Sequence, residues 1–122
     1  MLKHVALHNE DREKAKTFFT KIFGLSFKKT FNLNKQLTNK IFGINEDVTV
    51  DVYANEKIYL EIFITDLKTN HGFQHVCIKV ENKKEFIKQC KKYDIKPILI
   101  KKGEKTLLFI RDYSGNLFEI IE

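Results

Sequence analysis

The sequence lacks the features that mark membrane and secreted proteins. No apolar run among its 122 residues approaches the length of a membrane span. The N-terminus enters a strand pattern at once, with no signal-peptide core. We therefore expect one cytoplasmic domain with no membrane partner, large enough for a single core and too small for two independent ones.

Cysteine is scarce, and the two that occur, Cys77 and Cys90, are not expected to form a disulfide. Cys77 shares the strand parity of His75, whereas Cys90 lies on the apolar stripe of the helix that follows. Side chains on different faces of one sheet cannot meet the geometry that a disulfide requires. Both are interpreted as small buried hydrophobic residues.

The net charge is +6, but the sequence contains only two arginines, Arg12 and Arg111. The remaining positive charge is lysine, scattered over expected helix faces and strand ends. Lysine is a poor substitute for arginine, whose guanidinium makes the bidentate hydrogen bonds that recognise nucleic-acid bases. We expect no nucleic-acid partner, although the charge remains compatible with an anionic small-molecule substrate.

A half-length repeat organises the chain. The stretch Leu2–Leu25 reads as strand, helix and entry to a second strand, and Phe73–Ile98 is a weaker copy of it. Both copies open with His-Val, at His4 and His75, and carry an apolar residue two positions later. A repeat of this kind indicates that the same structural unit occurs twice in the chain. It predicts one unit built twice, with the two histidines facing the same cavity.

Residue spacing predicts the elements of the first half. Alternation indicates a strand over 2–8, and Asn9 is expected to cap the helix that follows. That helix has a broad apolar stripe and ends at Gly24. The stripe consists of Ala15, Phe18, Phe19, Ile22 and Phe23. The other expected elements are strands over 25–33, 47–54 and 58–64.

A short helix over 35–42, capped by Asn34 and ended by Gly43, has no counterpart in the second half. Leu37 and Ile41 are four residues apart and would share one face of it. This insertion at 34–43 could cover a cavity mouth or fill a gap in the core, and the second interpretation is favoured.

The second half repeats the order of the first after a polar connection over 65–72, in which His71 is read as a solvated loop residue. Asn82 with Glu85 resembles a capping box and opens a helix to about Tyr93. Pro97 sits at a strand start, where a missing N–H does least harm. The expected strands cover 73–80, 106–111 and 117–121.

Four polar residues interrupt these strands. His4 and His75 lie in the first strand of each half, and Glu61 and Glu119 in the last, each facing away from the apolar set. Two neutral imidazoles and two carboxylates balance a divalent cation, and suit zinc, nickel, cobalt, iron or manganese. From the residues alone, four separate polar side chains on half-exposed sheet faces remain an alternative.

Four stretches, taken in order, resemble the vicinal oxygen chelate superfamily, which includes glyoxalases, bleomycin-resistance proteins and extradiol dioxygenases. They are HVALHNEDREKAKTFFTKIFGL, YLEIF, QHVCIKVEN and RDYSGNLFEI. The resemblance implies an α+β fold of two βαβββ modules, at about 1–66 and 72–122. Their curled mixed sheets would surround a metal-containing cup, with the helices outside.

The resemblance places the metal ligands on His4, Glu61, His75 and Glu119, the same four residues that strand parity selects. A full set of this kind is similar to that of isomerases, namely glyoxalase I and the methylmalonyl-coenzyme A epimerases. The implied mechanism is proton abstraction next to a carbonyl, with Glu61 or Glu119 as the base. Four protein ligands leave room for substrate only in five- or six-coordinate geometry, which favours nickel or cobalt over tetrahedral zinc.

Two departures from the family pattern narrow the expectation. The family often has Asp-Pro before its final Gly-Asn turn, whereas here Asp112 is followed by Tyr113. Glyoxalases commonly carry an arginine near the end of the first strand for the glutathione carboxylate, and here the residue is His8. The second departure argues against a glutathione thioester substrate.

The resemblance leaves other functions open. One alternative is a non-catalytic ligand- or antibiotic-binding protein with an aromatic cleft. The residues that could form such a cleft are Tyr53, Tyr59, Phe63, Phe109 and Tyr113. Ordinary packing of these rings in the core and the sheets is the favoured interpretation. Another is a metal-dependent antibiotic-modifying transferase. We expect a homodimer, with each site built within one chain or across two. The candidate substrate-binding residues are His8, Tyr53, Tyr59, Phe63, Phe109 and Arg111.

Overall fold

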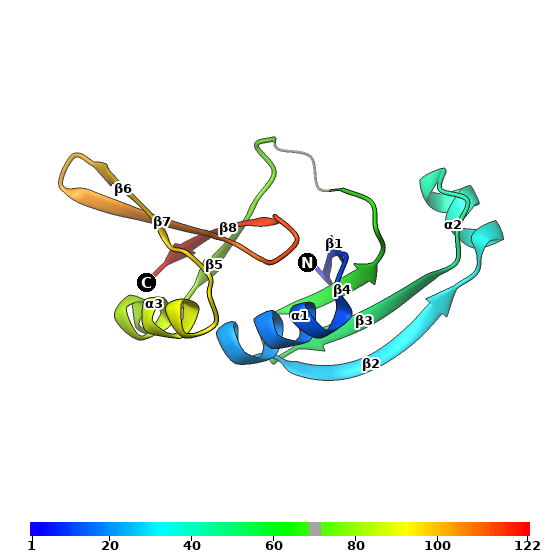
Figure 1. Ribbon diagram of the computed structural model, residues 1–122, viewed down its shortest axis with the longest axis horizontal. Helices are drawn as coiled ribbons and strands as arrows, with labels where there is room; N and C mark the ends of the chain where they lie inside the picture. The colour runs from blue at the N-terminus through cyan, green and yellow to red at the C-terminus, as the bar shows by residue number, and fades with distance from the viewer. Residues whose placement is uncertain (69–71) are drawn as a thin grey trace. The chain divides into compact units, whose positions relative to one another are not determined.

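The computed structural model describes residues 1–68 and 72–122, so the expected loop residue His71 lies outside the described residues. The chain divides into two compact units, Met1–Leu67 and Lys68–Glu122. Each unit has its own sheet and its own helix packed on that sheet (Figure 1). The two units are therefore described one at a time.

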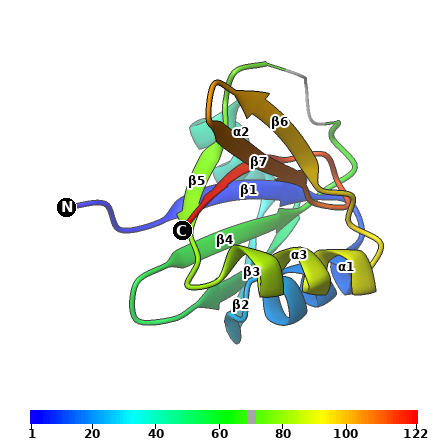
Figure 2. The same ribbon diagram turned by 90° about the vertical axis from the view of Figure 1, so that its left-hand side faces the viewer.

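The first unit is a βαβββ module with one insertion. Its four strands pair in the order β1-β4-β3-β2, which can be followed in Figure 2. Strands β1 and β4 run parallel and the other neighbours run antiparallel. Its elements are β1 (Val5–Asn9), α1 (Arg12–Thr17), the π-helix η1 (Phe18–Ile22), β2 (Ser26–Leu33), α2 (Lys35–Phe42), β3 (Val48–Ala54) and β4 (Tyr59–Ile64).

The second unit repeats this plan without the insertion. Its strands pair in the order β5-β8-β7-β6, again with the first pair parallel and the others antiparallel. Its elements are β5 (Val76–Lys79), α3 (Lys83–Lys92), β6 (Ile98–Lys102), β7 (Lys105–Arg111) and β8 (Leu117–Ile121). The predicted α+β class with two βαβββ modules and mixed sheets is confirmed.

The apolar stripe of the first helix is buried as predicted, but the helix begins later than predicted. The Asp11 side chain caps it by accepting from the backbone N–H groups of Glu13 and Lys14. Asn9, the expected cap, is instead the last residue of β1 and is fully buried. The strand extends one residue further than predicted, and Asp11, two residues after its end, takes the capping role.

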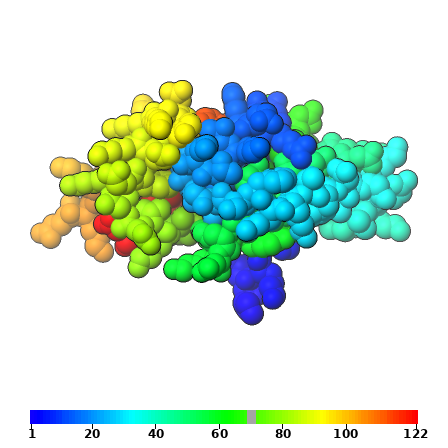
Figure 3. Space-filling view, turned by 90° about the horizontal axis from the view of Figure 1, so that it is seen from below, coloured from blue at the N-terminus to red at the C-terminus, as the bar shows by residue number. Residues whose placement is uncertain are grey.

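The helix widens into a π-turn at its C-terminal end. The N–H of Phe23 bonds the carbonyl of Phe18 at 3.2 Å, which is the i→i+5 pattern. The rings of Phe18, Phe19 and Phe23 meet there, with centroids 4.9–5.9 Å apart. Gly24 then takes a left-handed φ of 69° and ends the helix. This helix and β2 lie side by side on the surface of the first unit (Figure 3).

The insertion forms the predicted helix α2, with Asn34 as N-cap and Gly43 in the left-handed region. The favoured interpretation, that it fills a gap in the core, is wrong. Leu37 and Ile41 are 43% and 58% exposed, and Thr38 is the buried residue of this helix. The apolar face of α2 therefore does not pack into the core of the first unit.

The core of the second unit lies between α3 and its sheet. Asn82 caps α3 by accepting from the N–H of Glu85, as predicted. Cys90 is fully buried on this helix, whereas Cys77 is exposed on β5, so the expectation of burial is wrong for Cys77. Both cysteines are free. In the part of the chain that the structure describes, no helix is long and apolar enough to cross a membrane.

Candidate metal centre

Strand pairing places Glu61 and His4 on one face of the first sheet. Glu61 on β4 lies opposite Ala6 on β1 and opposite Val52 on β3. Directly opposite residues of neighbouring strands point to the same face, and residues two apart along one strand do so as well. His4 precedes Ala6 by two residues. The imidazole and the carboxylate therefore share the face that is turned away from α1.

The second unit repeats this register. Glu119 on β8 lies opposite Cys77 on β5 and opposite Phe109 on β7. His75 precedes Cys77 by two residues, as His4 precedes Ala6. The relation between histidine and glutamate is thus the same in both halves. One difference from the prediction is that each histidine lies one residue before its strand rather than within it.

In each unit the two side chains approach each other closely. His4 Nε2 lies 3.5 Å from Glu61 Oε2, and His75 Nε2 lies 3.6 Å from Glu119 Oε2. The histidine side chains are 46% and 39% exposed and the glutamates 18% and 27%. Each pair is therefore accessible to solvent and to a small molecule.

The two atoms of each pair lie further apart than the atoms of a direct hydrogen bond. An N–H···O bond joins atoms 2.7–3.2 Å apart, and both pairs are longer than about 3.2 Å. An imidazole nitrogen and a carboxylate oxygen are both ligands that divalent metals accept. Each unit therefore contributes one pair of donors that could hold a divalent metal.

The tautomer of His75 supports the same conclusion. Its Nδ1 lies 2.9 Å from the carbonyl oxygen of Phe73, which can only accept, so Nδ1 carries the proton. In a neutral ring Nε2 is then an acceptor, and it faces the acceptor oxygen of Glu119. A metal ion between them would satisfy both acceptors. Metal-bound histidines commonly donate their other N–H to a backbone carbonyl in this way.

The assembled group in each unit is a pair. Among residues 1–68 and 72–122 no cluster of three or more histidine, cysteine, aspartate or glutamate side chains could hold an ion. The sequence predicted a four-residue set, and the structure brings its members together two by two within the units.

Other predicted site residues share these two faces. His8 lies opposite Phe63 on the face of Glu61, and Tyr59 is two residues from Glu61 on the same strand. The rings of Tyr59 and His4 are 6.3 Å apart. In the second unit Phe109 lies opposite Glu119, and its ring stands 6.2 Å from that of His75.

Tyr53 does not share this face, although it was expected to line the substrate site. It lies opposite Leu60, so it points toward α1, where its ring packs against Phe19 at 5.5 Å. Tyr113 is also turned away, because its hydroxyl donates to the carbonyl of Tyr93. Within its own unit, neither Tyr53 nor Tyr113 therefore joins the aromatic residues that share the face of the glutamate.

The Arg111 side chain is hydrogen-bonded to the turn that follows it. Its guanidinium donates to the carbonyl oxygen of Gly115 at 2.7 Å. The Asp112 carboxylate accepts from the backbone N–H groups of Ser114 and Asn116 and from the Asn116 amide. Both residues hold the turn before β8, and this turn positions Glu119 three residues after Asn116.

Two features escaped the sequence analysis. Cys77 lies directly across the ladder from Glu119, and partial desolvation together with the Glu119 carboxylate raises the pKa of its thiol. Arg12 and Asp51 form a bidentate ion pair at 2.7 and 2.8 Å between α1 and β3. A carboxylate on the helix-facing side of an apolar strand was the available signal for this pair.

Solved structures support the fold. The chain resembles the fosfomycin resistance protein FosX from Listeria monocytogenes, with 14% identity, a TM-score of 0.75, and coverage of 98% of this chain and 90% of that one. A mutant of that protein in complex with Mn(II) and 1S,2S-dihydroxypropylphosphonic acid matches with 15% identity, a TM-score of 0.75 and coverage of 99% and 90%.

A glyoxalase family protein from Enterococcus faecalis matches with 21% identity and a TM-score of 0.74, over 100% of this chain and 97% of that one. No protein of curated function matches the sequence. The sequence profile of the glyoxalase/bleomycin resistance protein/dioxygenase superfamily matches residues 3–109. With most of the chain inside that match and both units built on the βαβββ plan, the chain belongs to the glyoxalase/bleomycin resistance protein/dioxygenase superfamily.

Proposed function

We propose that this protein is a divalent-metal-dependent enzyme of the lyase or isomerase type, which removes a proton from a carbon next to a carbonyl group. The observation that carries the proposal is the repeated pair of one imidazole and one carboxylate, 3.5 and 3.6 Å apart, at the same register in both units. Membership of the superfamily supports the metal-dependent part of the proposal.

The proposed ligands are His4, Glu61, His75 and Glu119, supplied by one chain or by two. Their two carboxylates balance the charge of nickel, cobalt, zinc, iron or manganese in the divalent state. When bound, such an ion supplies Lewis-acid stabilisation of the negative charge that develops on the substrate oxygens. The partial exposure of all four side chains leaves the substrate a route to the site.

The proposed base is one of the two glutamates, whose surroundings differ. Glu61 is the less exposed carboxylate and stands between Tyr59 and Phe63 on its strand face. Its neighbour across the ladder is Ala6, whereas the corresponding neighbour of Glu119 is the Cys77 thiol. Glu119 therefore has a polar neighbour across the ladder that Glu61 lacks, and both glutamates are candidates for the base.

The test is hydrogen exchange at the carbon next to the carbonyl. The metal-loaded protein is incubated in D₂O with a hemithioacetal or a 2-substituted acyl thioester, and deuterium in the recovered compound is measured by mass spectrometry. We expect exchange that falls about 10²–10⁴-fold in Glu61→Gln or Glu119→Gln, the usual contribution of a positioned base. Glu104→Gln, in the β6–β7 turn, is the matched control. Exchange that survives in both site variants would rule out the assigned base.

A second candidate is metal-dependent chemistry on a small phosphonate. It is favoured by the likeness to the Listeria protein, whose mutant was crystallised with Mn(II) and a phosphonic acid. The net charge of +6 suits such an anion. Incubation with fosfomycin and Mn(II), followed by ³¹P NMR, should give a new phosphonate resonance that disappears in Glu119→Gln. An unchanged spectrum alongside active deuterium exchange would leave the first candidate alone.

A further inference from the structure

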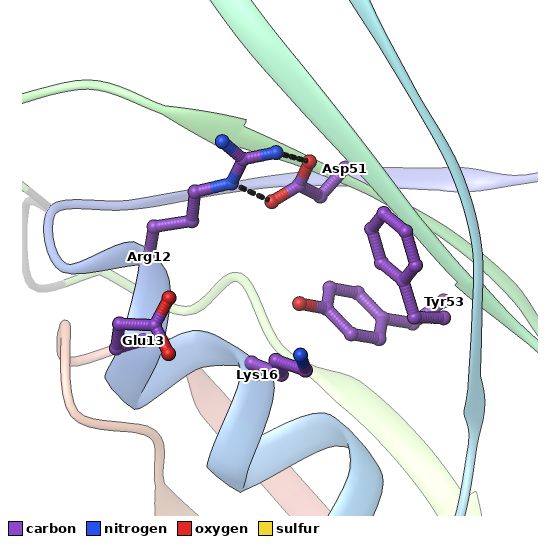
Figure 4. Close-up of a pocket in the computed structure, with 6 residues that line it drawn as sticks. Arg12, Glu13, Lys16, Asp51 and Tyr53 are labelled. Carbon is purple, nitrogen blue, oxygen red and sulfur yellow. Dashed lines mark hydrogen bonds and ion pairs between the residues drawn. The ribbon is translucent and has the colours of Figure 1, made fainter.

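A cavity of about 150 Å³ lies on the other side of the first sheet from Glu61. Its volume is about five times the share of one water molecule in the liquid. Its walls come from α1, β2 and β3, and Figure 4 shows their side chains arranged around a central space. The lining residues are Arg12, Glu13, Lys16, Phe27, Asp51 and Tyr53.

The hydroxyl of Tyr53 points into this cavity (Figure 4). The residue is 1% exposed, and its ring is held by Phe19 and Phe27 at centroid distances of 5.5 and 5.6 Å. Within the described part of the chain the hydroxyl makes no hydrogen bond. Burial raises the pKa of Tyr53 to about 12, so the group is a donor at neutral pH. The hydroxyl is open to the cavity, where a ligand with an acceptor atom can take its hydrogen bond.

The opposite wall is already satisfied. Arg12 Nε and Nη2 donate to the two oxygens of Asp51, and Nη2 also lies 3.3 Å from the Thr30 hydroxyl. Because this pair is bidentate and internally neutral, it does not call for an ion in the cavity. It supplies a polar wall whose positions are fixed.

The rim carries one charge of each sign. Glu13 and Lys16 are exposed and three residues apart on α1, so both reach the cavity from the same side of the helix. With the Arg12–Asp51 pair, the lining has two cations and two anions. A charged ligand would lie beside at least one group of its own sign. A neutral ligand with a donor and an acceptor could bond both Glu13 and Lys16.

We propose that this cavity binds a small neutral molecule of the amide type. Its carbonyl oxygen accepts from the Tyr53 hydroxyl and from Lys16, and its N–H donates to Glu13. The half-exposed ring of Phe27 provides an apolar contact at the mouth. The space suits a molecule of roughly ten non-hydrogen atoms or fewer. This site lies on the helix side of the sheet and is independent of the metal centre.

Three probes of the same shape and different charge test the proposal: benzamide, benzoate and benzamidinium. Their binding is followed by NMR titration of the tyrosine ring signals of the whole chain. We expect benzamide to bind with a Kd on the order of millimolar, as a ligand of nine heavy atoms can, and more tightly than either charged probe. Preference for benzoate or benzamidinium would overturn the proposed ligand class.

Variants of the lining identify the site. Tyr53→Phe keeps the ring and should weaken benzamide binding about five- to tenfold, the usual contribution of one hydrogen bond. Lys16→Met leaves the lining with an excess negative charge and should shift the preference toward benzamidinium. Lys14→Met, on the same helix but outside the cavity, is the matched control and should change neither.

Two results would overturn the proposal. No shift with any probe up to its solubility limit would mean that the cavity holds water alone. Equal benzamide affinity in the wild type, Tyr53→Phe and Lys16→Met would mean that the probe binds elsewhere. Lys16 is exposed, so its variant should fold even if the tyrosine variant does not, and the site remains testable.

Discussion

Replacing His75 with alanine should weaken the binding of a divalent ion by at least about a hundredfold, because loss of a direct ligand exceeds the 10–100-fold cost of disturbing a group behind one. His8→Ala should leave the affinity nearly unchanged. His8 lies on the same sheet face as Glu61 but outside the pairs that join each histidine to its glutamate. The measurement is isothermal titration of the apoprotein with Mn(II) and with Co(II).

The comparison of these two variants separates a specific site from a general affinity for imidazole. Both remove one histidine, so both lower any non-specific binding by a similar amount. Equal loss in the two variants would show that the ion does not use the His75–Glu119 pair. Full retention of affinity in His75→Ala would rule out His75 as a ligand, whatever the outcome for His8.

Replacing Arg12 with methionine should lower the free energy of unfolding by about 1–3 kcal/mol, less than the cost of breaking a fully buried ion pair because the Arg12 side chain is 48% exposed. The Asp51 side chain is 2% exposed, and both oxygens accept from the guanidinium. Without Arg12 a carboxylate would stay buried with no cation beside it. The apolar length of methionine preserves the packing of the arginine stem, so the effect reports the lost charge.

The control for this prediction is the double variant Arg12→Met/Asp51→Leu, which removes both charges. We expect it to recover much of the loss, because a buried pair can often be replaced by apolar residues at little cost. Urea unfolding midpoints give the comparison, and Lys14→Met on the same helix gives the reference for an exposed site. A double variant no more stable than Arg12→Met alone would contradict the account.

Much of the fold followed from strand parity and helical spacing. The set Leu60, Ile62 and Glu61 alternates along β4, and this alternation alone places the carboxylate away from α1. The half-length repeat then predicts the same arrangement around Glu119. Both predictions needed only the two-residue period of a strand, which is visible in the sequence as alternating apolar and polar residues.

The position of Tyr53 could not be read in the same way. Parity groups it with Asp51, yet it does not say which face of β3 joins the face of Glu61 on β4. That choice depends on the register across the turn, where Val52 rather than Tyr53 stands opposite Glu61. A shift of one residue would reverse every side chain.

The start of the first helix was missed for a similar reason. Asn9, Glu10 and Asp11 offer several side chains that could cap it. The length of the parallel pairing between β1 and β4, which ends with Asn9 opposite Ile64, decides among them. This is a tertiary contact between residues far apart in the sequence.

The most direct test of the account is the metal content of the untagged protein, measured by elemental analysis after loading and dialysis. If His4, Glu61, His75 and Glu119 hold one shared ion, the wild type should retain one ion per chain. His4→Ala and His75→Ala should each lose it, because each removes a ligand of the same centre. Two ions per chain, or an ion retained in either variant, would contradict the shared centre. No metal after incubation with nickel, cobalt, zinc, iron or manganese would contradict the metalloenzyme itself.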